Sequence, residues 1–286
     1  MRGGRKMLAC LMVVSLTGCA VATPYVPQGG HATVSRGEPI APIDFFGNIF
    51  GLFSKVLLLN WKVDNHAISQ ETEAHLNRYV DSPNSMTEGT HFSLNEYAPG
   101  RALHRLMTNR KVAWPYRLLI GLPLTLLSDV VIPGRLFAGF LNPGDSYNPY
   151  TDTVSLYSDL PSIVLHEAGH AHDTNQRRYK GTYATIRLLP LVDLYQEFQA
   201  TDEAIRYLTE TGDRKEELAS YKILYPAYGS YLGSYFFPPI GTLGGVVIGH
   251  VVGRAKVLER RGFYTRLDET TQTPSTPSSK IEKTRP

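Results

Sequence analysis

Apolar positions along the chain recur mainly with helical spacing. Residues 45–61 are strongly apolar with Lys55 as their only charge, and residues 64–80 continue with charges spread as on a solvated helix face. One long helix or a helical hairpin accounts for both segments. Residues 153–157 instead alternate apolar and polar side chains, as a half-buried strand does. The pattern predicts a mainly helical α+β domain with a small antiparallel sheet.

Residues 116–140 resemble a membrane span in their hydrophobicity, but Pro123, Asp129 and Pro133 interrupt them. A buried, broken helix is therefore favoured over a transmembrane or re-entrant segment. Within residues 45–61, large apolar side chains at spacings of three and four form a stripe. Such a stripe suits either a core or a bilayer interface, and the core is the default expectation.

The last apolar segment carries glycine at every fourth position: Gly241, Gly245, Gly249 and Gly253. A stripe of small residues lets two helices approach closely, either in lipid or in a tightly packed protein. Two prolines precede the segment and basic residues follow it, which leaves about 14 uninterrupted residues, fewer than the ~20 that a span needs. Packing within the protein is therefore favoured.

The beginning of the chain predicts its location. Residues 1–18 combine three basic side chains with a short apolar stretch, and Leu16-Thr17-Gly18-Cys19 places small residues before a cysteine. This segment resembles a bacterial lipoprotein signal, which implies cleavage before Cys19 and acylation of that cysteine. An ordinary secretory signal is the alternative. Ala20 in the second mature position implies an outer-membrane anchor in the bacterial envelope, with the domain facing the periplasm.

Composition divides the remaining chain and excludes some partners. Residues 19–42 are rich in proline and glycine and predict a flexible tether, and residues 268–286 predict a disordered tail. One domain, residues 43–267, lies between them. Three of the 29 basic residues precede Cys19, and the remaining 26 equal the 26 acidic ones, so no nucleic acid partner is expected. Because the domain contains no cysteine, a metal ion would need His, Asp or Glu ligands.

Such ligands occur in the sequence His166-Glu167-Ala168-Gly169-His170. On a helix, residues four apart differ by about 40° around the axis, so His166 and His170 can bind one ion while Glu167 projects beside them. The strand-like residues 153–157 precede this segment, and Pro161 suits the first turn of its helix. A core helix whose histidines happen to be four apart is the alternative interpretation.

The position of a third ligand distinguishes the classes of metallopeptidase. Asp173 and Gln176 stand where the metzincin pattern has glycine and histidine, which excludes that class. Glu197 lies in a following segment of helical spacing, residues 193–208. A histidine pair with a glutamate on a later helix resembles the gluzincin metallopeptidases, such as thermolysin. The resemblance implies a zincin-like core in which His166, His170 and Glu197 bind one Zn²⁺ ion.

The same resemblance implies that Glu167 is the general base that activates a zinc-bound water. It also expects an acid four residues after Glu197, where this chain has Thr201. Orientation of an imidazole is therefore expected from another acid, Asp173 or Asp193. A solvated acid near the end of the helix is an equally good interpretation of Asp173. Glu203 points away from Glu197 on the helix and is expected on a solvated face.

A donor that stabilises the tetrahedral oxyanion is also expected. His250 is one candidate, because it is an isolated polar ring on the glycine-rich segment. A satisfied core histidine is the alternative reading of this residue. The other candidates are four tyrosines close in sequence: Tyr225, Tyr228, Tyr231 and Tyr235.

Together these features predict a membrane-anchored, zinc-dependent peptidase that hydrolyses peptide bonds of envelope proteins. Its partners would be a protein or peptide substrate and, through the lipid on Cys19, the membrane. Two alternatives come from other classes of protein. One is a catalytically silent zinc-binding lipoprotein, and the other is a structural envelope protein without a metal.

Overall fold

The computed structural model describes residues 24–25, 32–139 and 141–272. The predicted signal segment with Cys19 and the last 14 residues lie outside this part of the chain. The helices and π-helical segments are α2 (Ala41–Phe50), α3 (Leu52–Leu57), α4 (Gln70–Val80), α5 (Pro99–Thr108), α6 (Trp114–Tyr116), η1 (Arg117–Gly121), α7 (Leu122–Thr125), η2 (Leu126–Val131), α8 (Gly134–Phe137), α9 (Pro161–Gln176), α10 (Lys180–Ile186), α11 (Val192–Glu210), α12 (Arg214–Ser234) and α13 (Ile240–Gln272). The mainly helical α+β class is confirmed.

The sheet is small and mixed, with strand order β1-β2-β3-β5-β4. Its strands are β1 (Pro24–Tyr25), β2 (Thr33–Arg36), β3 (His91–Leu94), β4 (Ser146–Asn148) and β5 (Thr153–Leu156). β2, β3 and β5 are parallel, whereas β1 and β4 are antiparallel to their neighbours. The prediction of an antiparallel sheet was therefore wrong. Helices separate β2 from β3 and β3 from β5 along the chain, and such long crossovers join parallel strands.

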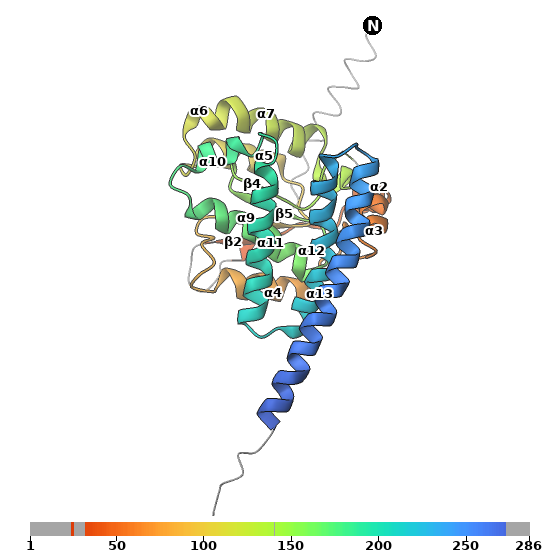
Figure 1. Cartoon of the computed structure of the whole chain (residues 1–286). Coiled ribbons are helices and arrows are strands. Elements are labelled where there is room, and N and C mark those ends of the chain that lie inside the picture. Colours follow the sequence, from red (N-terminus) through yellow and green to blue (C-terminus); the bar gives the residue numbers. More distant parts are fainter. Residues whose placement is uncertain (1–23, 26–31, 140, 273–286) are drawn as a thin grey trace, which may run out of the picture.

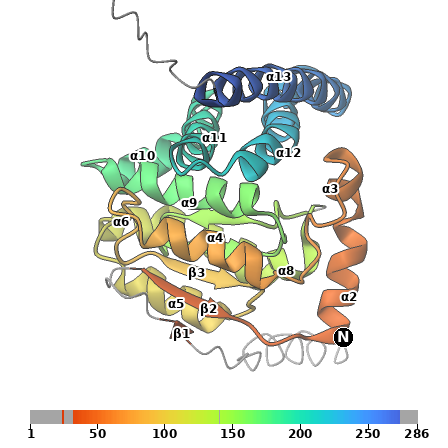
Figure 2. The same cartoon turned by 90° about the horizontal axis from the view of Figure 1, so that it is seen from below.

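The two faces of the central strands differ in polarity. Phe92 and Leu94 of β3, with Val154 and Leu156 of β5, belong to the main hydrophobic core. Alternate residues of the same strands point to the opposite face, because side chains of a strand alternate. Figure 2 shows α4 and α9 over one face of the sheet and α5 over the other. Helices α11, α12 and α13 then form further layers beyond α9, so that α9 is buried on both sides.

The domain begins earlier than the sequence predicts. Strand β2 and the first residues of α2 lie inside the segment expected to be a flexible tether. Pairing of β2 with β3 explains this difference, since Val34 lies opposite Phe92 and is buried in the main core. At the other end, α13 continues to Gln272, past the expected start of the tail.

The apolar segments lie in positions that the hydrophobic pattern does not predict. Residues 114–131 form a continuous helical run in which two π-helical segments flank α7. Many of its large side chains are exposed, as are those of α2 and α3, so the expectation that these segments are buried was wrong. Among the described residues, none of the helices combines the length and the hydrophobicity that crossing a membrane requires.

The glycine stripe of α13 faces α12, as the prediction of packing within the protein requires. An ideal Cβ atom built on Gly245 would lie 2.0 Å from the carbonyl oxygen of Gly229, and one on Gly241 would lie 2.3 Å from that of Gly233. Backbone atoms cannot give way as a flexible side chain can. Glycine on both helices therefore permits the close contact between α12 and α13.

We expect Gly245→Ala to destabilise the domain by about 1–3 kcal/mol, because the added methyl group overpacks the contact between the helices. Gly244→Ala is the matched control, since an ideal Cβ there has no neighbouring atom within 4 Å. Alanine at position 244 should be neutral or slightly stabilising, as expected in a helix interior. Thermal unfolding of both variants measures the difference, and equal melting temperatures would contradict the role given to the stripe.

Candidate metal centre

Helices α9 and α11 bring together the one group of three His, Cys, Asp or Glu side chains in the described residues that could hold a metal ion. Its members are His166 and His170 of α9 and Glu197 of α11, and one ligand atom from each lies within 4.8 Å of the other two. Gly169 allows the helices to approach, because a Cβ atom there would lie 2.8 Å from the carbonyl oxygen of Ala200. The motif thus supplies two of the three candidate ligands and the close contact that brings Glu197 to them.

Glu197 lies between the two imidazoles. His166 Nε2 is 3.1 Å from Glu197 Oε2, and His170 Nε2 is 3.4 Å from Glu197 Oε1. Burial opposes ionisation of Glu197, but its interactions with the imidazoles of His170 and His166 hold the pKa of this carboxyl well below its usual value. Burial also lowers the pKa of His170 to about 4. The neutral imidazole and the carboxylate are the protonation states that metal binding requires.

His166 behaves differently. Burial lowers its pKa, but its hydrogen bond with Glu197 outweighs burial, and the pKa of this imidazole is raised. A metal ion would displace that shared proton, because a ligating imidazole is neutral. Two imidazole nitrogens and a carboxylate oxygen converging in a buried position match the donor set of Zn²⁺. The residues present therefore fit a metal ion.

Glu167 lies beside this group and outside it. Its side chain lines two cavities, each of which also contains Glu197 and Tyr231. Burial raises the pKa of Glu167 to about 7, and the charges of Glu197 and Asp145 act in the same direction, against the lowering effect of His166. A buried carboxyl group with such a pKa can both accept and release a proton near neutral pH.

The larger of these two cavities, about 220 Å³, is bounded by the edge strand β4. Ser146 and Tyr147 of β4 line it together with Glu167 and His170. β4 pairs with β5 on one side only, since it is the last strand of the sheet. An extended peptide could therefore pair with β4 beside the cluster.

The structure corrects the expected partners of the histidines. Thr201 Oγ1 is 3.3 Å from His166 Nδ1, so the hydroxyl itself occupies the place where an acid was expected. The carboxylate of Asp173 instead binds Arg177 and the hydroxyl of Tyr183. Asp193 accepts a hydrogen bond from Tyr235. Neither acid takes the orienting role predicted for it.

Arg187 is a residue of this site that sequence reasoning missed. Its guanidinium forms an ion pair with Glu197 and lies 3.2 Å from Gln196 Oε1. It also lines the cavity that contains Glu167 and His170. Arg187 lies near the end of α10, ten residues before its partner on α11, and no motif in the sequence marks it.

Of the two kinds of oxyanion donor considered, the structure brings a tyrosine to the cluster and leaves His250 apart. His250 Nε2 is 2.8 Å from the carbonyl oxygen of Leu57, and Arg254 Nη1 is 2.8 Å from its Nδ1. Neither cavity that the described residues form at the cluster is lined by His250, so the catalytic role predicted for it is not supported. Tyr231 lines both cavities, and the charge of Glu197, together with burial, raises the pKa of its phenol. The phenol remains a donor at neutral pH.

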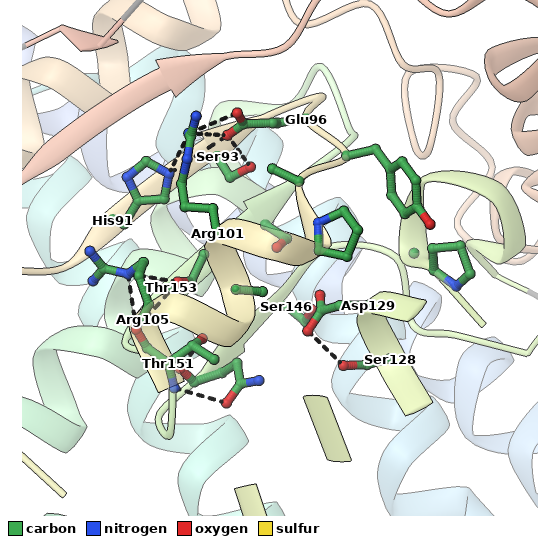
Figure 3. Close-up of a pocket in the computed structure, with 18 of the residues that line it drawn as sticks. His91, Ser93, Glu96, Arg101, Arg105, Ser128, Asp129, Ser146, Thr151 and Thr153 are labelled. Atoms are coloured by element: carbon green, nitrogen blue, oxygen red, sulfur yellow. Dashed lines mark hydrogen bonds and ion pairs between the residues drawn. The ribbon is translucent and has the colours of Figure 1, made fainter. Parts of the chain in front are cut away.

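A separate polar pocket lies on the opposite face of the sheet, between β3, β5 and α5. Figure 3 shows His91, Ser93, Glu96 and Arg101 grouped at one side of it, with Asp129 and Ser128 at the other. The charges at its first side are paired, since Arg101 Nη1 is 2.7 Å from Glu96 Oε1 and 3.1 Å from Ser35 Oγ. This network holds β2, β3 and α5 together and does not indicate a reaction.

Comparisons of the chain with protein-family models, with curated proteins and with solved structures found no match. The functional argument therefore rests on the geometry of the cluster and on the sequence motif.

Proposed function

We propose that the chain is a zinc-dependent metallopeptidase of the gluzincin type, anchored in a bacterial envelope by a lipid on Cys19. The observation that carries the proposal is the convergence of His166, His170 and Glu197 beside the carboxyl of Glu167, which lines the same cavity. A helix with structural histidines would not require a third ligand from another helix, nor an unligated acid facing the same cavity.

The sheet supports a zincin-like core. The sheet has three parallel strands, β2, β3 and β5, and the antiparallel strand β4 at its edge. The helix that carries the histidine pair, α9, packs on this sheet. Only β1 and β4 pair antiparallel with their neighbours. Of these two strands, β4 borders the cavity beside the cluster. Edge-strand pairing would hold an extended substrate across Glu167 and His170.

Each side chain has a distinct task in the proposed reaction. His166, His170 and Glu197 would hold the Zn²⁺ ion, which supplies Lewis acidity and lowers the pKa of water to about 7. Glu167 accepts a proton from the attacking water and then donates it to the leaving amine. Tyr231 donates a hydrogen bond to the oxyanion of the carbonyl under attack. Thr201 orients His166 through its second ring nitrogen.

Cleavage of a panel of unfolded proteins by the purified chain tests the proposal. Activity should disappear on chelation and return when Zn²⁺ is added. Activity that survives complete removal of metal would exclude a metallopeptidase. The chelated protein should also melt at a lower temperature than the zinc-loaded one, because a ligand of the native state stabilises it.

We expect Tyr231→Phe to lower kcat by about 10²-fold or more while zinc content and melting temperature stay nearly unchanged. The substitution removes the phenolic donor and keeps the ring. Tyr225→Phe is the matched control, because Tyr225 lies on the same helix and packs against Tyr221. Steady-state kinetics on one peptide compares the three proteins. Equal turnover would remove Tyr231 from the mechanism.

A further inference from the structure

Large apolar side chains are exposed on four segments of the described structure, which we call the apolar surface. The segments are α2 with α3 and the turn that follows, α6 through η2, the connection between α10 and α11, and the turn from α12 into α13 together with α13 as far as Gly253. Phe237 is 86% exposed, Leu119 and Ile240 are each 76% exposed, and Trp61 is 71% exposed. Isolated apolar residues on a surface are ordinary, but a gathering of this extent marks an interaction site.

The four segments lie next to one another in space. Figure 1 places α6, α7 and the turn between α12 and α13 at the same end of the molecule, with α2 and α3 on the adjoining side. Hydrogen bonds join the neighbours: the backbone N–H of Leu191 donates to Tyr235 Oη at 3.2 Å. The hydroxyls of Tyr116 and Thr182 are 2.9 Å apart. The contact of His250 with Leu57 links α13 to α3.

Charge is divided sharply along α13. From Ile223 to Gly253 the sequence contains no Asp, Glu, Lys or Arg, whereas charged residues recur from Arg254 onward. The two charged side chains of α2 and α3 are not free to repel lipid, because Asp44 pairs with Arg135 and Lys55 is buried. In the other segments, Lys62 and Arg187 pair with Asp159 and Glu197, Arg117 donates to backbone carbonyl oxygens, and Asp129 accepts a hydrogen bond from Ser128. The apolar surface therefore carries few unpaired charges. Arg254, which is exposed, stands at its boundary on α13, and Lys256, which pairs with Glu259, follows it.

This pattern fits a lipid bilayer better than a protein partner. Aromatic and aliphatic side chains that project from a surface with few unpaired charges enter the region between headgroups and acyl chains. Basic residues at the boundary then meet anionic headgroups, which attract Lys and Arg. Arg254 and Lys256 are placed for this contact, because they lie within the first turn after the uncharged part of α13 ends.

We propose that the apolar surface docks the domain on an anionic phospholipid bilayer, with the turn between α12 and α13 inserted among the headgroups. Docking would act together with the proposed lipid on Cys19, since stable membrane attachment usually needs two signals. The proposal does not depend on the metal centre or on peptidase activity.

Binding to vesicles tests the proposal on the chain that starts at residue 19 and carries Cys19→Ala, so that no lipid contributes. This protein should float with vesicles of phosphatidylcholine and phosphatidylglycerol. The pair Phe237→Glu and Ile240→Glu should weaken binding by at least about tenfold, because two exposed apolar side chains become charged. The matched control is Leu258→Glu with Leu267→Glu, two exposed leucines on the charged half of the same helix, and it should bind like the unmodified domain.

Arg254→Glu with Lys256→Glu should weaken binding to the anionic vesicles and leave the weaker binding to phosphatidylcholine unchanged. The proposal would be overturned if the unmodified domain did not bind vesicles. It would also be overturned if Leu258→Glu with Leu267→Glu weakened binding as much as Phe237→Glu with Ile240→Glu. Light scattering tests whether a second copy of the chain occupies the surface instead. If the domain is a dimer and Phe237→Glu with Ile240→Glu dissociates it, the surface is a dimer interface. Melting temperatures confirm that each variant is folded, and zinc content is measured separately.

Discussion

Glu167→Gln is expected to retain zinc and to lower peptide cleavage by about 10²–10⁴-fold, the usual contribution of a general acid or base. Glutamine keeps the size of the side chain but cannot accept the proton of the attacking water. Because Glu167 lies outside the group of three ligands, the metal site should stay intact. Cleavage of unfolded proteins and metal analysis of the same preparation measure the two effects separately.

Glu203→Gln is the matched control for this prediction. Glu203 is also a buried carboxylate, but it accepts a hydrogen bond from Tyr79 at 3.0 Å and pairs with Arg206. Its loss should affect stability and leave turnover per folded molecule unchanged. If Glu167→Gln keeps full activity, the general base has been assigned wrongly. A zinc-loaded protein that cleaves no substrate even with Glu167 present would favour the catalytically silent alternative.

The ligand group could be predicted because it depends on short-range geometry. His166 and His170 lie one helical turn apart whatever surrounds them. Glu197 was assigned from the resemblance to the gluzincin pattern, and the helical spacing of its segment indicated that it lies on a helix. The contacts of Thr201 and Arg187 with this group depend on how α9, α10 and α11 cross, which no periodicity records. The burial of Glu203 was not predicted for the same reason. Its side chain was expected on a solvated face, but α4 covers it.

The sheet was mispredicted for a similar reason. Alternation of apolar and polar residues identifies a strand, but whether two strands run parallel or antiparallel depends on which distant segments pair. Thr33 lies opposite His91, and His91 lies opposite Thr153, so three short segments far apart in the sequence form the parallel centre. The connection between β4 and β5 is short, and it joins neighbouring strands as an antiparallel pair at the edge.

Hydrophobicity alone did not distinguish a buried segment from an exposed one. Trp61 and Leu119 lie in segments that were expected to be buried, and both are exposed. The glycine stripe was more informative, because spacing by four predicts which face of a helix approaches a neighbour. That face packs on α12, and the remaining faces of the same helix contribute to the apolar surface.

His166→Ala is expected to reduce bound zinc from about one ion per chain to nearly none, because a structural or catalytic zinc site needs at least three protein ligands. Peptide cleavage should fall with it. The matched control is His172→Ala: this histidine lies on the same helix and is buried, but its Nδ1 contacts the carbonyl oxygen of Ser85 at 2.9 Å. His172→Ala should keep its zinc. Metal analysis after dialysis compares the two variants, and zinc retained without His166 would show that the ligands have been assigned wrongly.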